Sequence, residues 1–392
     1  MSSNSTTHEF PVPVGGVPYP LDFAPSILFA VLYGFMVPVV VYRMVHPRSR
    51  NGVLIGTTVF SIERVVSYGL RAHAAYSASA RASEDLETYF QTTYSGGFTS
   101  IGQDLMQLFR ALLVSSTLGG DMVALHNLTP PLVFRAQTRR RDVSEEVPLT
   151  AGPSDHDSDS DDGYSASGSG SGFRSGWPKA NASASTSMVD VGAQLEDQPE
   201  LRKTIRAWCA VPGLLSLAVA IMSIVAGSNY RGALDNGSHA SLVRSLWYAC
   251  DTLGVVLLVG IAATAVFAYV KLPRVPRASL LWIIVLALLL ATVGIYRITV
   301  LTHSTTSLFS MAPGGQNTPR EKAAFYVFHV APEFIVAAVL MALNVRRVFG
   351  TGPWGDHLAE DPKPKTEAEE AAKKTTWAGR AWARLRGSKE RS

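Results

Sequence analysis

Cysteine is almost absent from this chain, since Cys209 and Cys250 are the only two among 392 residues. The first lies near the inner end of one apolar run and the second near the outer end of the next. Their depths in a bilayer would therefore differ too much for a disulfide bond. We expect two buried thiols that pack as small hydrophobic side chains.

Motifs of several well-defined functional classes are missing as well. No glycine-rich nucleotide-binding loop occurs, which argues against ATP as an energy source. A retinal protein needs a lysine within the last apolar run, whereas Lys322 stands at the mouth of that run. His303, His329 and Glu333 lack the close spacing of a metal-dependent hydrolase. The Asp-Arg-Tyr and Asn-Pro-x-x-Tyr motifs of the largest receptor class are absent too, and we expect no enzymatic activity, metal or cofactor.

Charge is sparse and unevenly spread along the chain. Charged residues make up 17% of it, the formal net charge is +4, and the hydrophobic residues, 47% of the total, are gathered into separate runs. A run of about 20 apolar residues can cross a bilayer as a helix. Seven runs qualify: Ser26 to Tyr42, Val53 to Ala74, Ile101 to Leu125, Ala207 to Ala226, Leu246 to Val270, Leu280 to Leu301 and Ala323 to Val345. The pattern predicts an all-α polytopic membrane protein with seven transmembrane helices.

The third run is the most polar, and its crossing follows from parity. The connections at residues 43–50 and 271–277 are short and basic. Positively charged connections tend to remain inside, which places both in the cytoplasm. An even number of crossings must then separate them, and this holds only if the third run also crosses. The N-terminus is therefore expected outside and the C-terminus in the cytoplasm.

The runs divide the chain into five segments. These are an extracellular N-terminal segment (1–25), transmembrane helices one to three (26–134), a cytoplasmic loop (135–206), helices four to seven (207–349) and a cytoplasmic tail (350–392). Asn4 and Asn236 each begin an Asn-x-Ser/Thr tripeptide on the predicted outer side, which makes them candidate glycosylation sites.

The loop and the tail suggest cytoplasmic partners. Residues 154–162 intersperse serine with aspartate, inside a Ser/Gly/Ala-rich segment that lacks the apolar residues for a core. We expect a disordered loop that is either a kinase substrate or a solvated spacer. On a helical wheel, residues 373–386 place Trp377, Trp382 and Leu385 opposite basic side chains. That pattern predicts either a helix lying on the anionic inner leaflet or a basic soluble tail.

Ionisable residues inside the apolar runs are the strongest indication of function, because a charge at membrane depth is costly unless it faces a partner or water. Glu63 stands in the middle of the second run. Residues three and four apart share one face of a helix. This spacing gives polar stripes of Gln103, Gln107, Arg110, Thr117 and Asp121 in run three, Glu63, Ser67 and Arg71 in run two, and Tyr326, His329 and Glu333 in run seven.

Lipid cannot solvate such stripes, so we expect them to face the bundle interior. Glu63, Arg110 and Glu333 are expected near the midplane. The outer half is expected to hold Arg71, Asp104, Asp251, Arg297 and His329. This arrangement predicts a polar cavity that opens towards the outer surface. The alternative is that these groups only form ion pairs that fix helix packing, such as Glu63 with Arg110 and Asp251 with Arg297.

A polar cavity of this kind suits an amphipathic small molecule with a charged head group. Arginine can hold a phosphate or carboxylate in bidentate fashion, and a carboxylate could hold an amine or carry a proton during transport. The candidate cavity residues are Glu63, Ser67, Tyr68, Arg71, Gln107, Arg110, Asp251, Arg297, His329 and Glu333. The expected partners are membrane lipids and such a ligand, and no nucleic acid.

Four segments carry a family pattern: residues 24–34 (APSILFAVLYG), 62–71 (IERVVSYGLR), 296–297 (YR) and 321–333 (EKAAFYVFHVAPE). Together they resemble a fungal family of seven-span membrane proteins, the lipid-translocating exporters linked to resistance against toxic sterols and sphingoid bases. The positions that match are Glu63, Tyr68, Arg71, Arg297, Glu321 and Pro332. His329 stands where that family usually has aspartate, and Tyr68-Gly69 reverses the family's usual order.

The resemblance implies a plasma-membrane protein that binds an amphipathic lipid or xenobiotic and translocates or exports it. Fungal chains that look like this one are also labelled family C-like G-protein-coupled receptors. That similarity implies an alternative, a seven-span sensor that uses the same cavity for a ligand. Its basic inner loops and residues 139–141 would then contact a G protein.

Overall fold

The computed structural model describes residues 8–46, 50–119, 196–352 and 354–356. The long helices are α1 (Phe23–Val45), α2 (Ile55–Tyr76), α4 (Glu84–Ser115), α8 (Pro199–Ser228), α10 (Gly237–Lys271), α11 (Arg277–Leu301), and a last rod of α12 (Pro319–Phe325), the π-helical turn η4 (Tyr326–Val330) and α13 (Ala331–Ala342). The short elements are η1 (Pro20–Asp22), η2 (Gly52–Leu54), α3 (Ala78–Arg81), α9 (Tyr230–Asp235), α14 (Val345–Phe349), β1 (Phe10–Pro11) and β2 (Ser304–Thr305).

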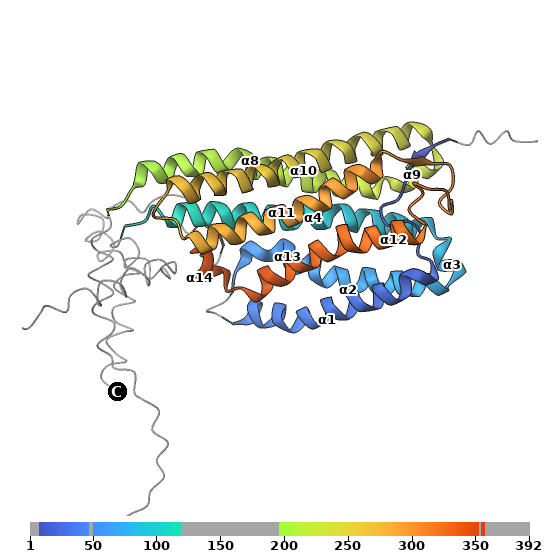
Figure 1. Cartoon of the computed structure of the whole chain (residues 1–392), viewed down its shortest axis with the longest axis horizontal. Helices are drawn as coiled ribbons and strands as arrows, with labels where there is room; N and C mark the ends of the chain where they lie inside the picture. The colour runs from blue at the N-terminus through green and yellow to red at the C-terminus, as the bar shows by residue number, and fades with distance from the viewer. Residues whose placement is uncertain (1–7, 47–49, 120–195, 353, 357–392) are drawn as a thin grey trace, which may run out of the picture.

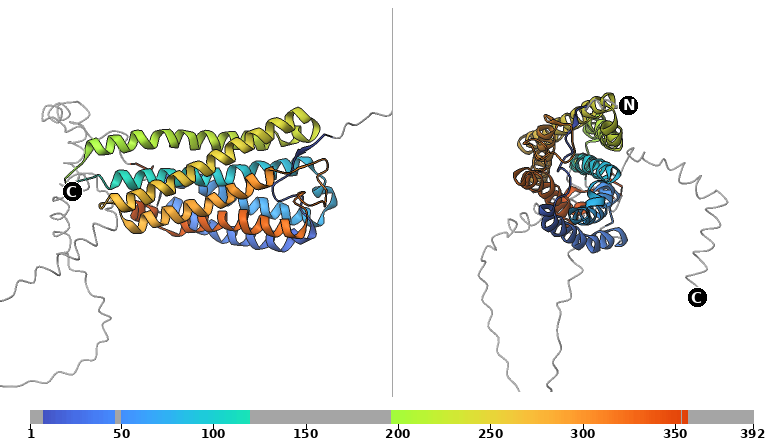
Figure 2. Two further views of the ribbon diagram at one scale, coloured as in Figure 1. Left: turned by 45° about the horizontal axis from the view of Figure 1, so that its top comes forward. Right: turned by 90° about the vertical axis from the view of Figure 1, so that its right-hand side faces the viewer.

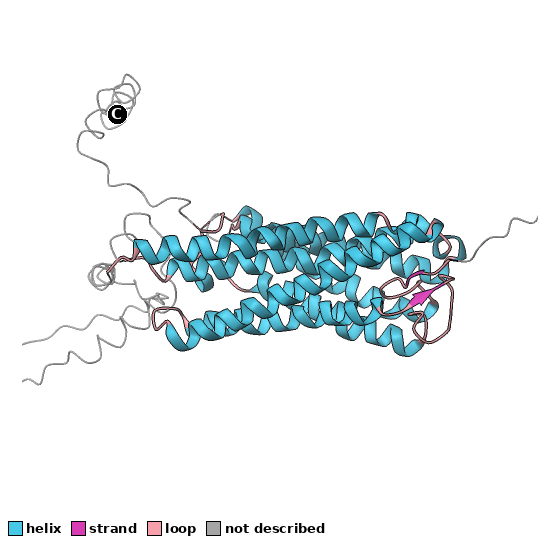
Figure 3. Cartoon of the chain, turned by 90° about the horizontal axis from the view of Figure 1, so that it is seen from above, coloured by secondary structure: helices cyan, strands magenta, loops and turns pink. Residues whose placement is uncertain are grey.

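The long helices run side by side as one elongated bundle (Figure 1). At one end β1 pairs antiparallel with β2, close to α3 and α9, and we call this the strand end (Figure 3). The opposite end carries α14 and the beginning of α2, and we call it the α14 end. The two-residue strands are the only sheet among the described residues.

Six of the helical rods are long and apolar enough to cross a membrane. Their outward faces are hydrophobic, as Phe35 with 74% of its surface exposed and Trp208 with 78% illustrate. Helices satisfy their backbone hydrogen bonds internally, which is what a segment surrounded by lipid requires. The expectation of an all-α multi-pass membrane protein is confirmed at this level.

The helix α4 lies in the middle of the bundle, where it packs against α2, α8, α10, α11 and α13 (Figure 2). It begins at Glu84, where Ser83 accepts a hydrogen bond from the backbone N–H of Leu86 at 3.3 Å. We expected this run to begin only at Ile101, which is wrong. The polar side chains in the first half of α4 lower its mean hydropathy below that of a membrane-spanning segment. Three of them, Glu87, Gln91 and Ser95, are nevertheless buried inside the protein.

Other expected boundaries also shift. The helix α8 begins at Pro199, so the last residues that we assigned to the cytoplasmic loop are helical. The helix α10 begins at Gly237, before the expected Leu246. Most of the expected loop and nearly all of the tail, with residues 154–162 and 373–386, lie outside the described residues, as does Asn4. Cys209 and Cys250 are free and buried, as expected.

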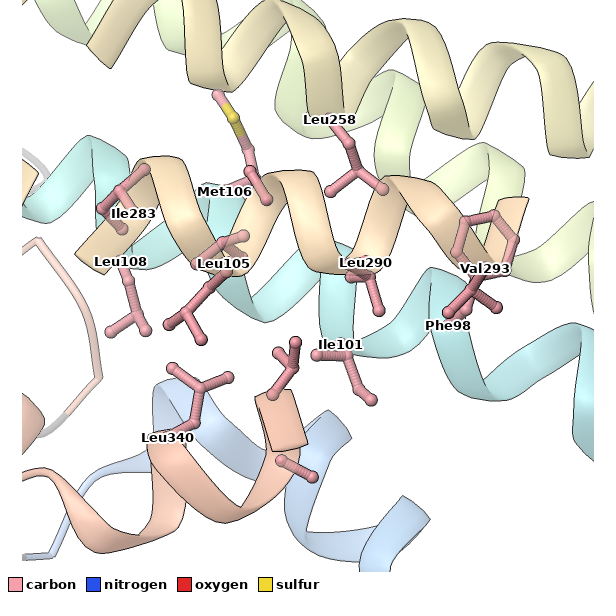
Figure 4. Packing of buried hydrophobic residues seen from close by; sticks show 14 of the residues in the cluster. Phe98, Ile101, Leu105, Met106, Leu108, Leu258, Ile283, Leu290, Val293 and Leu340 are labelled. Carbon is pink, nitrogen blue, oxygen red and sulfur yellow. The ribbon is translucent and has the colours of Figure 1, made fainter. Parts of the chain in front are cut away.

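The apolar core fills the space between α4, α10, α11 and α13 (Figure 4). Phe98 of α4 lies beside Val293 of α11, and Leu105 of α4 lies close to Leu340 of α13. Small residues permit the closest approaches. A Cβ atom built on Gly227 of α8 would lie 2.5 Å from the Cα atom of Thr92 in α4.

The packing at Gly227 predicts that Gly227→Ala lowers the stability of the purified protein. The added methyl group meets backbone atoms that cannot move aside, so we expect a loss of about 1–3 kcal/mol in thermal or denaturant unfolding in detergent. Gly260→Ala is the matched control, because Gly260 lies in α10 with no atom within 4 Å of the added Cβ. Equal stability of the two variants would contradict this account of the α4–α8 contact.

Candidate functional site

The inward face of α2 is marked by Arg64, and not by Glu63 as the sequence suggested. Thr57, Ser61, Arg64 and Arg71 are all fully buried. Consecutive residues of a helix point about 100° apart, so only one of two neighbours can lie at the centre of a face. Glu63 consequently lies at the edge of this face, with 24% of its side chain exposed.

Arg64 organises a central cluster, which we define as Glu63, Arg64, Ser67, His329 and Glu333. Its Nη2 atom lies 3.0 Å from Glu333 Oε2, and its Nη1 atom lies 3.3 Å from Glu63 Oε2. Glu63 also accepts hydrogen bonds from Ser67 and, at 3.0 Å, from the hydroxyl of Tyr89 in α4. The cluster therefore connects α2, α4 and the last rod.

Aromatic rings surround the central cluster. The guanidinium of Arg64 lies 4.2 Å from the ring centroid of Phe60 and 5.1 Å from that of Tyr94. The imidazole of His329 stacks on Phe325 at 5.3 Å and meets Tyr94 edge-on at 5.7 Å. Such rings stabilise a buried cation through its attraction to the negative face of the ring.

Several buried polar atoms around this cluster have no hydrogen-bond partner in the described part of the chain. They are Tyr33 Oη, Arg64 Nε, Tyr68 Oη, both ring nitrogens of His329 and Glu333 Oε1. Buried polar groups are nearly always hydrogen-bonded, so each unpaired one calls for an explanation. These atoms offer both donors and acceptors to a small polar group that enters the bundle.

A second group of charges lies near the strand end, and we define the strand-end cluster as Asp22, Arg71, Lys322 and Tyr326. Asp22 pairs with Arg71 Nη2 and with Lys322 Nζ, each at 3.0 Å. The hydroxyl of Tyr326 lies 3.0 Å from Asp22 Oδ1. All four side chains are buried, and they connect the beginning of α1 with α2 and the last rod.

A third group of buried charges is the ion pair of Asp251 in α10 with Arg297 in α11, which we had predicted as a contact that fixes helix packing. Arg297 Nε lies 3.0 Å from Asp251 Oδ1, and both side chains are fully buried. Arg297 Nη2 also donates to Ser95 Oγ of α4 at 2.8 Å. The pair is therefore shared by three helices.

The polar residues of α4 that we assigned to the cavity lie elsewhere. Arg110 is 3.6 Å from Asp356 at the α14 end, and Asp356 also binds Arg206 of α8 at 2.7 Å, so the suggested pair of Glu63 with Arg110 does not form. Gln107 is partly exposed on the side of α8, near Gly213. Because α4 begins earlier than expected, all these residues shift towards the α14 end.

Asp104 is displaced in the same way and was wrongly expected in the half of the bundle that holds Arg71. It accepts hydrogen bonds from the backbone N–H of Thr57 at 2.6 Å and from the Thr57 hydroxyl at 2.7 Å. Thr57 belongs to the first turn of α2, near the α14 end. Asp104 therefore satisfies the N-terminal amides of a helix, a favourable place for a carboxylate.

The expected single cavity is replaced by separate clusters of charged groups. A cavity of about 520 Å³ does lie between α11 and α12, but its lining contains none of the ten candidate residues. Its wall is largely apolar, with Tyr296, His303 and Glu321 among the polar residues. No group of three His, Cys, Asp or Glu side chains could hold a metal ion within the described ranges.

Sequence reasoning missed Arg64, Asp22 and the role of Lys322. The inward direction of Arg64 could have been predicted, because it stands seven residues before Arg71 and therefore on the same face of the helix. Asp22 precedes the first apolar run, and its pairing depends on how the chain enters the bundle. Nothing in the local sequence indicates that contact.

The buried pair of Asp251 and Arg297 predicts a specific pattern of stability losses. Arg297→Met leaves the Asp251 carboxylate buried without its partner, and we expect a loss of about 3–5 kcal/mol in detergent unfolding. The double variant Asp251→Ala with Arg297→Met removes both charges and should recover most of that loss. If the double variant instead loses as much stability as Arg297→Met and Asp251→Ala lose together, the ion pair does not account for the burial of these side chains.

Comparison with protein-family models, with curated proteins and with solved structures gives no match to this chain.

Proposed function

We propose that α4 forms a seventh crossing and that the strand end lies outside the cell. With 32 residues α4 spans about 48 Å, more than the hydrocarbon core of a bilayer requires. The basic connections at 43–50 and 271–277 follow the α14-end termini of α1 and α10, which supports a cytoplasmic location for that end. Asn236, the exposed cap of α10, lies at the opposite end and is accessible for glycosylation.

We further propose that the protein binds an amphipathic lipid or xenobiotic and translocates or exports it across the plasma membrane of a fungal cell. The observation that carries this proposal is the ion pair of Arg64 and Glu333 beside an irregular segment of the last rod. Among the described residues, Glu333 Oε1 and both ring nitrogens of His329 have no hydrogen-bond partner, and His329 Nε2 lies 3.9 Å from Glu333 Oε1. The cluster can therefore accept a further polar group without losing the ion pair of Arg64 with Glu333.

The last rod supplies a place where the bundle could change shape. The turn Tyr326–Val330 is π-helical, and Pro332 lies two residues after its end. Proline removes a backbone hydrogen bond from a helix, and π-helical turns interrupt the regular spacing, often at functional sites. A movement at this turn would shift His329 relative to Glu333, and so change which polar atoms face the central cluster.

Access to the central cluster is proposed between α2 and α4. Glu63 is the partly exposed member of the cluster, and Ser67 lies 3.3 Å from Thr93 of α4 at the same edge. The head group of an amphipathic molecule could exchange contacts with Glu63 and Ser67 while its apolar part remains in lipid. The resemblance to lipid-translocating exporters supports the same reading.

A second candidate function is a receptor that senses the ligand and contacts a G protein. The specific observation in its favour is that the buried charges are already paired within separate clusters, because a sensor needs no passage through the bundle. The cluster of Arg110, Arg206 and Asp356 at the α14 end would then be where a conformational change is transmitted to a cytoplasmic partner.

The translocation proposal predicts that Glu63→Gln slows the movement of fluorescent sphingoid-base and phospholipid probes across reconstituted vesicles. Loss of the charged hydrogen bonds of Glu63 is worth about 1.5 kcal/mol or more, which corresponds to roughly a tenfold reduction in rate. Glu84→Gln is the matched control, because Glu84 is an exposed carboxylate at the start of α4.

Probe movement in wild-type vesicles that does not exceed that in protein-free vesicles would contradict translocation. Equal rates for wild type and Glu63→Gln would exclude the central cluster as the path. Ligand-stimulated nucleotide exchange on a co-purified G protein, in the absence of probe movement, would favour the receptor function.

A further inference from the structure

The chain segment before η1 is inserted into the strand end of the bundle. Residues 10–18 are buried without interruption, although only Phe10 and Pro11 belong to a regular element. We expected residues 1–25 to form an extracellular N-terminal segment, and residues 10–18 of it are packed against the helices of the bundle. We call residues 10–18 the inserted segment.

The inserted segment is held mainly by side chains of the bundle that bind its backbone. Gln91 accepts from the N–H of Val14 at 3.0 Å and donates to the Val14 carbonyl at 3.2 Å. Asn317 accepts from the N–H of Val17 at 3.0 Å. These contacts are made to backbone atoms and not to side chains of the segment, which turns at Val14 and Gly15, where the N–H of Gly16 donates to the Pro13 carbonyl at 3.0 Å.

The two cations of the strand-end cluster bind carbonyl oxygens of this segment. Arg71 Nη2 donates to the carbonyl of Gly15 at 2.5 Å and to that of Gly16 at 3.2 Å. Lys322 Nζ donates to the carbonyls of Gly15 at 2.8 Å and Val17 at 2.6 Å. The segment thus presents three oxygen atoms to two buried cations that share one carboxylate partner, Asp22.

Converging arginine and lysine donors are the usual means by which proteins hold a phosphate or carboxylate. The neutral carbonyls of the inserted segment are weaker acceptors than an anion would be. Glu87 is the other buried acidic group of this region, and it is already engaged by Gln91 Nε2 at 2.7 Å. An anionic group could therefore replace the carbonyls while Asp22 and Glu87 retain their partners.

We propose that the strand end holds a binding site for the anionic head group of an amphipathic molecule, formed by Arg71 and Lys322, and that the inserted segment occupies this site and competes with the ligand. The inference rests on the proposed function, because it gives the same ligand a second head-group contact, at the strand end and separate from the central cluster. It adds that this contact is made to an anionic part of the head group and that binding there requires the segment to withdraw.

The fit of the segment offers a way to displace it. Gly16 has a positive φ of 58°, and a Cβ atom built on it would clash with the Gln316 carbonyl oxygen. Gly16→Ala is therefore expected to expel the segment from the bundle. Gly34→Ala is the matched control, since Gly34 has no atom within 4 Å of an added Cβ.

The opposite change is a disulfide bond that keeps the segment in place. Pro11 is the register partner of Ser304 in the pairing of β1 with β2. Directly opposed residues of paired strands have a separation suitable for a disulfide bond. In a background with Cys209→Ala and Cys250→Ala, Pro11→Cys with Ser304→Cys should form this bond on oxidation and release it on reduction.

The first measurement tests whether the segment moves. Val12→Cys, in the same cysteine-free background, is treated with a membrane-impermeant maleimide. Val12 is fully buried, so labelling should be slow in the parent and in Gly34→Ala, and at least about tenfold faster in Gly16→Ala, where the segment is released. Equal labelling rates for Gly16→Ala and Gly34→Ala would show that the inserted segment stays in place, and would overturn the proposal.

The second measurement tests the ligand class. Fluorescent lysophosphatidate and a neutral monoacylglycerol of the same chain length are titrated in nanodiscs of neutral phosphatidylcholine. We expect Gly16→Ala to bind lysophosphatidate at least about tenfold more tightly than Gly34→Ala, because more of the protein is competent to bind. The oxidised Pro11→Cys/Ser304→Cys protein should bind it least and recover on reduction, while the monoacylglycerol should not distinguish the variants.

Faster labelling of Gly16→Ala without tighter lysophosphatidate binding would overturn the anionic site. An equal increase in affinity for lysophosphatidate and for the monoacylglycerol would overturn it as well. The failure of the proposed function is separable from this result. A wild-type protein that moves no probe across vesicles, while Gly16→Ala shows the expected selective binding, would remove the translocation proposal and leave the head-group site intact.

Discussion

The ion pair of Arg64 with Glu333 is the interaction on which the arrangement of this bundle depends. It joins α2 to the last rod across 269 residues of sequence, and both side chains are completely buried. A charge that faced lipid instead would cost several kcal/mol, and a buried charge without its partner costs nearly as much. The pair therefore fixes the rotation of both helices about their axes. Once α2 is fixed, Arg71 also faces inward, and the strand-end cluster can form around it.

Each of the three buried groups of charges connects a different set of helices. The strand-end cluster ties the entry of α1 to α2 and the last rod, the central cluster joins α2, α4 and the last rod, and Asp251 with Arg297 joins α10 and α11 to α4. Each group includes at least one cation that has more than one acceptor. A cation with several acceptors can change partners at lower cost than one with a single partner, which is a property that both translocation and sensing require.

Much of the fold could be predicted from composition and periodicity. The apolar runs gave the positions of most long helices, and the pair of Asp251 with Arg297 was expected as a packing contact. The helix α4 could not be delimited in this way, because hydropathy treats Glu87 and Gln91 as exposed, whereas other helices surround them. Because α4 begins at Glu84 and not at Ile101, Asp104, Gln107 and Arg110 lie nearer the α14 end than expected and do not meet the other candidate residues.

The sequence by itself determined that this is a helical multi-pass membrane protein with ionisable groups at membrane depth, because length, hydropathy and helical spacing are local properties of the chain. Only the tertiary structure decided that Arg64 rather than Glu63 lies at the centre of its face, which partners each charge has, and that residues 10–18 enter the bundle. Helical spacing gives the relative directions of side chains within one helix. The absolute direction depends on contacts with helices that are hundreds of residues away, and those contacts are made only when the whole bundle packs.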